Sequence, residues 1–67
     1  MTIGEKINEL RKEKNMTLSE LAQKSGVSAA TLTNWKLGKT KPQLVALSKV
    51  ATALECDLSS LRFFFGN

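Results

Sequence analysis

Residues 26–41 carry hydrogen-bonding and cationic side chains but no carboxylate. Thr33 and Asn34 can donate and accept hydrogen bonds, which suits recognition rather than catalysis. No acid lies between Glu20 and Glu55. The lysines of this interval are Lys24, Lys36, Lys39, Lys41 and Lys49. A run of this kind is either a solvated basic face or a surface for a polyanion.

The composition excludes most reactive chemistry. The chain has 67 residues, enough for a single domain, with a net charge of +4 and no His or Tyr. His is the commonest acid–base group, and the sequence shows no phosphate-binding glycine loop or paired carboxylates. Cys56 is the only cysteine and belongs to no metal-ligand cluster, so it is interpreted as a small core residue. We therefore expect no enzyme activity, cofactor, metal or small-molecule substrate.

The distribution of apolar residues also bears on location. No apolar run approaches the roughly 18 residues that a membrane span requires, and no signal-peptide pattern opens the sequence. A single cysteine fits a reducing compartment. A cytoplasmic protein without membrane contact is predicted.

Helical apolar spacing predicts an all-α fold in one domain, residues 1–67. The expected helices lie near residues 3–14, 17–25, 28–37, 42–54 and 58–65.

Most of these helices have recognisable ends. Thr2 with Glu5, and Thr17 with Glu20, have the spacing of capping boxes. Ser28 is a good N-cap for the third helix. Glycines that favour left-handed helix ends close the second and third helices at Gly26 and Gly38, and Asp57 is expected to cap the fifth.

The same spacing predicts which side chains are buried. Leu32 and Trp35 should point inward from the third helix. The buried side of the fourth helix is expected to consist of Leu44, Leu47, Val50, Ala51 and Leu54.

The second and third helices, joined by a tight turn at Gly26, form a helix-turn-helix at about residues 17–37. With Leu32 and Trp35 inside, the outward residues of the third helix are Ala29, Ala30, Thr33, Asn34 and Leu37. Short side chains without carboxylates would let this helix approach base edges in a major groove. The alternative is an ordinary helical bundle with a solvated polar face.

Two segments carry a family resemblance. The residues MTLSELAQKSGVSAATLTNWKLGKTKP, 16–42, resemble the helix-turn-helix of the Cro/CI-type, lambda-repressor-like DNA-binding domains (XRE family). LVALSKVATALECDLSSL, 44–61, is similar to the family's last two helices. The resemblance implies a transcription regulator, repressor-like, that binds palindromic double-stranded DNA as a homodimer, at least on DNA.

It also implies roles by position. The residues expected to read bases are Ala29, Ala30, Thr33 and Asn34. The residues expected to contact phosphates are Thr17, Leu18, Ser28, Thr31, Lys36, Lys39 and Lys41.

The sequence departs from the family pattern at three places. Leu18 stands where Gln is frequent, so its side chain cannot hydrogen-bond to DNA. Members often have Glu at the position of Lys36, paired with an Arg at the position of Arg11. Because both residues are cationic here, we expect Lys36, Arg11 or both to contact phosphates. Ala29 and Ala30 stand where longer polar readers are frequent, which predicts either modest sequence specificity or more reliance on DNA shape.

Three consecutive aromatic residues, Phe63, Phe64 and Phe65, lie near the end of the chain. Successive helical residues differ by about 100°, so a small core can cover only part of this group. An exposed remainder would mark an interface, whereas the alternative is that the end of the helix frays and folds its rings back onto the core. We expect the homodimer surface here. The alternative function is a protein-interaction module, or an antitoxin-like protein that holds its partner with this end.

Overall fold

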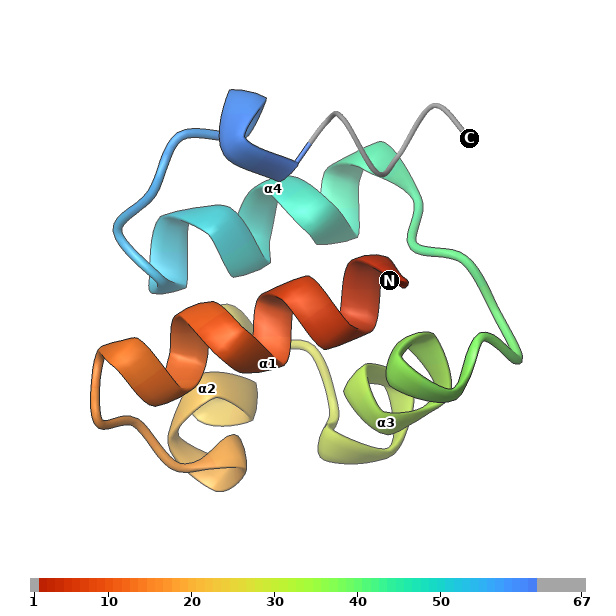
Figure 1. The fold of residues 1–67 in the computed structure, drawn as a ribbon, viewed down its shortest axis with the longest axis horizontal. Coiled ribbons are helices and arrows are strands. Elements are labelled where there is room, and N and C mark those ends of the chain that lie inside the picture. Colours follow the sequence, from red (N-terminus) through yellow and green to blue (C-terminus); the bar gives the residue numbers. More distant parts are fainter. Residues whose placement is uncertain (1, 62–67) are drawn as a thin grey trace.

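The computed structural model describes residues 2–61 of the chain (Figure 1). Four helices are present, α1 (Ile3–Glu13), α2 (Leu18–Ser25), α3 (Ala29–Leu37) and α4 (Leu44–Ala53). Residues 59–61 are also helical and begin the fifth helix. No strand occurs within residues 2–61. The predicted all-α fold is confirmed, and the rest of the predicted 58–65 helix lies outside the described residues.

The capping boxes predicted at the starts of the first two helices are present. The Thr2 hydroxyl accepts the Glu5 N–H, and the Glu5 carboxylate accepts the Thr2 N–H at 2.7 Å. Thr17 and Glu20 repeat this arrangement at the start of α2. These hydrogen bonds lower the pKa of both glutamates, and the bond from the backbone N–H of the threonine has the largest effect. Three separate local patterns therefore fixed helix boundaries, since Ser28 also caps α3 as predicted.

Helices α2 and α3 both end in a left-handed glycine. Gly26 has φ 75° and Gly38 has φ 76°, a region that costs other residues energy but not glycine. Gly26 turns the chain between α2 and α3, whereas Gly38 turns it into the loop toward α4. The two helices of the helix-turn-helix are therefore short and sharply ended.

One apolar core lies between the helices. Leu21, Leu47, Leu54, Val50 and Leu61 are the largest fully buried side chains. In Figure 1, α1 crosses the middle of the view, with α4 drawn above it and α2 and α3 below. Helix α1 packs mainly against α3, and α2 packs against α4 and α3. Trp35 is 3% exposed, so its predicted core position is confirmed.

Cys56 packs at the edge of this core. It is half-buried against the buried cluster and forms no disulfide. Burial raises the pKa of its thiol, and the nearby Asp57 carboxylate acts in the same direction. These properties agree with a small core residue, because a reactive cysteine needs a lowered pKa.

The fourth helix differs from its prediction. It begins at Leu44 after the cap residue Gln43, rather than at Pro42, which is buried in the preceding loop. Leu44 was predicted to be buried but is 55% exposed. Apolar spacing identifies the face of a helix, but not how far along its axis the neighbouring helices reach. As the first residue of α4, Leu44 lies beyond the covered part.

Helix α1 approaches the backbone of α3 closely at Gly4. A Cβ built on Gly4 would lie 2.1 Å from the backbone nitrogen of Lys36 and 2.3 Å from the carbonyl carbon of Trp35. The Thr2 hydroxyl donates a hydrogen bond of 3.1 Å to the Lys36 carbonyl next to this contact. The start of α1 therefore fixes the position of the last turn of α3.

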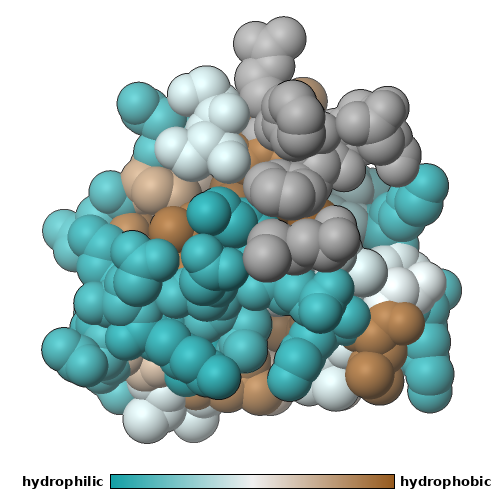
Figure 2. Space-filling model, in the orientation of Figure 1, coloured by the Kyte–Doolittle hydropathy of each residue, from teal (hydrophilic) through white to brown (hydrophobic). Residues whose placement is uncertain are grey.

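The face of the molecule drawn in Figure 2 is mostly hydrophilic, with apolar side chains scattered on it. Among the described residues, the large apolar side chains that are exposed are Leu37, Leu44 and Val45. The outward position predicted for Leu37 is confirmed by its 60% exposure. Among the described residues no helix has the length and apolar character needed to cross a membrane.

Candidate nucleic-acid interface

The outward face of α3 carries small side chains and no acid. Ala30 and Thr33 are exposed, whereas Ala29 and Asn34 are half-buried. These four residues were predicted to read bases, and α3 brings them onto one stretch of surface, although Asn34 is less accessible than expected. A surface with no carboxylate on this helix can approach a polyanion without repulsion.

The beginning of α3 is held by its own side chains. The Ser28 hydroxyl accepts the Thr31 N–H at 3.1 Å, and the two hydroxyls share a hydrogen bond of 2.8 Å. Both residues were predicted to contact phosphates. Only one of the two hydroxyls donates their shared bond, so the other hydroxyl hydrogen remains available for a phosphate oxygen.

The beginning of α2 presents backbone rather than side-chain donors. In the capping box, the Thr17 N–H donates to the Glu20 carboxylate and the Glu20 N–H donates to Thr17. A phosphate at this helix end would therefore be met by the N–H groups of Leu18 and Ser19. The Leu18 side chain is half-buried and turned toward the core.

The loop after α3 carries exposed cations. Lys39 and Lys41 are both exposed, and the Lys39 N–H donates to the Asn34 carbonyl at 3.0 Å. This bond and the buried Pro42 anchor the loop at both ends. The lysine ammonium groups can therefore extend from a defined backbone beside α3.

Comparison with known proteins agrees with this geometry. A family model described as helix-turn-helix matches residues 7–61. The chain belongs to the Cro/CI-type helix-turn-helix family. The transcriptional regulator SinR of Bacillus subtilis is 38% identical to this helix-turn-helix domain over 60 residues, which are 88% of the chain and 54% of SinR. The family match agrees with the prediction that the domain is not an enzyme.

Two further relatives are described as repressors. The immunity repressor of Bacillus phage phi105 is 34% identical over 61 residues, 91% of this helix-turn-helix domain and 42% of the relative. The repressor RghR of Bacillus subtilis is 35% identical over 66 residues, 97% of the chain and 49% of RghR. The chain thus spans about half the length of these relatives.

Arg11 is held by hydrogen bonds within the helix-turn-helix domain. Two guanidinium nitrogens of Arg11 donate to the Asn8 side-chain oxygen, at 3.1 and 2.6 Å, and a third donates to the Met16 carbonyl. These bonds use three of the five N–H donors of the Arg11 guanidinium. Its main contacts hold the turn between α1 and α2. Lys36 is exposed and free of such internal bonds within the described residues.

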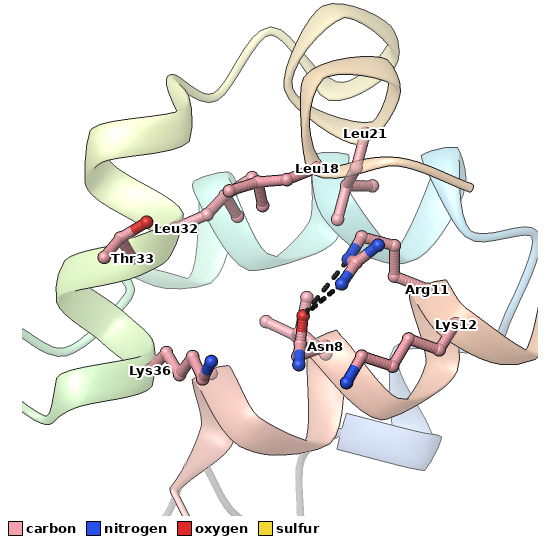
Figure 3. Close-up of a pocket in the computed structure, with 10 residues that line it drawn as sticks. Asn8, Arg11, Lys12, Leu18, Leu21, Leu32, Thr33 and Lys36 are labelled. Carbon is pink, nitrogen blue, oxygen red and sulfur yellow. Dashed lines mark hydrogen bonds between the residues drawn. The ribbon is translucent and has the colours of Figure 1, made fainter. Parts of the chain in front are cut away.

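A hollow of about 230 Å³ lies between α1, α2 and α3 of this helix-turn-helix domain (Figure 3). Asn8, Arg11 and Lys12 line it from α1, and Thr33 and Lys36 line it from α3. Sequence reasoning did not single out Asn8 and Lys12. Their spacing with Arg11 places all three on one face of α1, but the proximity of Lys36 depends on how α1 packs against α3.

Proposed function

We propose that this chain is the DNA-binding domain of a transcription regulator. The regulator is proposed to be a repressor-like protein of the cytoplasm. In this proposal α3 lies in the major groove of double-stranded DNA. The observation that carries the proposal is the outward face of α3, which has small side chains, Thr33 and Asn34, and no acid. The family membership and the regulators among the relatives support it.

The contacts are assigned by position. Ala29, Ala30, Thr33 and Asn34 face the bases. The residues proposed to contact the DNA backbone are Thr17, Leu18, Ser28, Thr31, Lys36, Lys39 and Lys41. Phosphate contacts set the position of the domain, whereas base contacts determine sequence preference.

We also propose that two domains bind a palindromic operator as a homodimer. Two recognition helices must lie about 34 Å apart on successive turns of the duplex. The proposed dimer surface, Phe63, Phe64 and Phe65, lies outside the described residues. In the described part, exposed Leu44 and Val45 at the start of α4 supply further apolar surface of the kind that marks interfaces.

A salt series tests the proposal directly. If each domain neutralises about four to six phosphates, the slope of log K against log salt should be roughly −4 to −5 per half-site. Between 50 and 200 mM salt, the affinity for one half-site should then fall roughly 250- to 1,000-fold. Fluorescence anisotropy with labelled duplex measures this change.

The controls are a random duplex and a duplex that carries one half-site. Random duplex should show a steep slope as well, but weaker binding at every salt concentration. The palindrome should bind cooperatively relative to the single half-site if the domain dimerises on DNA. An affinity that does not depend on salt would exclude the major-groove proposal.

Asn34→Ala should reduce sequence preference more than overall affinity. The Asn34 amide has a donor and an acceptor that match the edge of adenine, and a good bidentate pair contributes about 1–3 kcal/mol of discrimination. We expect the operator affinity to fall by roughly this amount, with little change on random duplex.

Lys39→Ala is the matched control because Lys39 is proposed to contact phosphate. This variant should weaken operator and random duplex alike and make the salt slope less steep by about one. If Asn34→Ala instead weakens both duplexes equally, Asn34 contacts the backbone and base reading must come from other residues.

A further inference from the structure

The hollow between α1, α2 and α3 carries positive charge that the described part of the protein does not neutralise. Arg11, Lys12 and Lys36 line it, and no carboxylate does. Within residues 2–61 the single ion pair is Lys6–Glu9, at 3.7 Å. Lys12 and Lys36 extend toward the hollow from opposite helices (Figure 3). Three like charges repel one another, and a bound anion would relieve that repulsion.

Glu5 is the acid on α1 that interacts with Lys36, and it is engaged elsewhere. Glu5 accepts the Thr2 N–H, and its pKa is lowered chiefly by this hydrogen bond and by the Thr2 hydroxyl. Lys36 is the last of the groups that lower the pKa of Glu5, so Glu5 is held by Thr2 more than by Lys36. Lys36 therefore remains available for an outside anion.

Arg11 is held in place by hydrogen bonds and keeps donors for such a ligand. A guanidinium has five N–H donors, and Asn8 and the Met16 carbonyl take three of them. These bonds fix the plane of the group and leave two donors. A fixed guanidinium loses less conformational entropy when it binds a phosphate or carboxylate than a mobile one does.

The floor of the hollow is apolar. Ile7, Leu18 and Leu32 line it below the cationic rim. A free phosphate ion or a DNA phosphate would use the rim alone. An apolar floor favours a ligand that has a short apolar body attached to its anionic group. The volume of about 230 Å³ is below that of drug-sized pockets, so the ligand should be small.

We propose that this hollow binds a small free molecule with one phosphate or carboxylate group and a short apolar body. Thr33 and Lys36 belong both to the hollow and to the proposed DNA face. The ligand would therefore compete with DNA, and by linkage DNA would weaken binding of the ligand by the same factor. The competition rests on the proposed function, whereas binding of the anion does not.

The binding test uses amide chemical shifts of the whole chain during titration with inorganic phosphate and with phenyl phosphate. We expect saturable shifts at Asn8, Leu18 and Thr33. Phenyl phosphate should bind about tenfold tighter than inorganic phosphate, because part of its ring leaves water at the apolar floor. Shifts that do not saturate with either compound would overturn the proposal.

Charge variants test whether phenyl phosphate binds in the hollow. Lys36→Glu places a carboxylate opposite Arg11 and should weaken phenyl phosphate binding by about tenfold or more. Lys49→Glu makes the same charge change at an exposed position of α4 and should have little effect. Lys36→Gln is a milder second variant should the reversal disturb folding, which circular dichroism checks. Equal losses at positions 36 and 49 would mean a general charge effect and contradict the site.

Experiments with duplex DNA distinguish a free phosphate ligand from a phosphate of the DNA backbone. Phenyl phosphate should lower DNA affinity of the original protein, but not of Lys36→Glu. If free phosphates do not saturate the hollow while Lys36→Glu still weakens DNA binding, the rim serves the DNA backbone and the small-molecule proposal is wrong. If the phosphates saturate the hollow and no duplex is bound, the anion site stands and the proposed DNA-binding function fails.

Discussion

Gly4→Ala is expected to lower the free energy of unfolding by about 3 kcal/mol or more, or to unfold the domain altogether. The added methyl group would lie 2.1 Å from the Lys36 nitrogen, and the groups that it meets are backbone atoms. A backbone cannot rotate away as a flexible side chain can, so α1 and α3 would have to separate. Chemical denaturation followed by circular dichroism measures the loss.

The sign of this effect is informative because Gly4 lies within a helix. Helix propensity alone predicts that Ala stabilises such a position by about 1 kcal/mol. Gly26→Ala is the comparison: it has open space around the new methyl but a φ of 75°, so a loss of about 1 kcal/mol is expected. A stabilised Gly4→Ala protein would show that α1 and α3 are further apart than described.

Leu47→Ala is expected to cost about 2–5 kcal/mol. Leu47 is fully buried on α4, and its truncation leaves a cavity in the only large core that the described residues form. A domain of this size rarely has more than about 3–5 kcal/mol of stability, so this variant should be largely unfolded near physiological temperature. Thermal denaturation is the appropriate measurement.

Leu44→Ala is the matched control, with the same residue type on the same helix. Leu44 is 55% exposed, and its truncation should change stability by less than about 1 kcal/mol. Comparable losses at the two positions would mean that Leu44 is covered in the protein, as the apolar spacing alone had predicted.

The local features of the fold could be predicted because they depend on nearby residues. The capping boxes at Thr2 and Thr17 and the left-handed ends at Gly26 and Gly38 each need only a few neighbouring residues. Trp35 could be placed inside because helical spacing relates it to Leu32. These features fixed the boundaries of α2 and α3 and therefore the proposed reading surface.

Other features depend on distances between helices and could not be predicted. The role of Gly4 follows from the close approach of α3, more than 30 positions later in the sequence. Arg11 could not be assigned to Asn8 and the Met16 carbonyl, because the spacing of charges does not show which acceptors the turn after α1 provides. The hollow could be predicted only in part. Helical spacing places its α1 cations on one face, but their proximity to Lys36 depends on how α1 packs against α3.

The contact between α1 and α3 has a consequence for the effect of ionic strength. It includes close packing at Gly4 and a hydrogen bond from Thr2 to the Lys36 carbonyl, and neither of these contacts pairs opposite charges. Dissolved ions screen interactions between charges but leave neutral contacts almost unchanged. These two contacts should therefore hold the last turn of α3 against α1 alike in dilute and concentrated electrolyte. Added salt would also screen the repulsion between Lys36 and the cations of α1, so it should not drive the two helices apart.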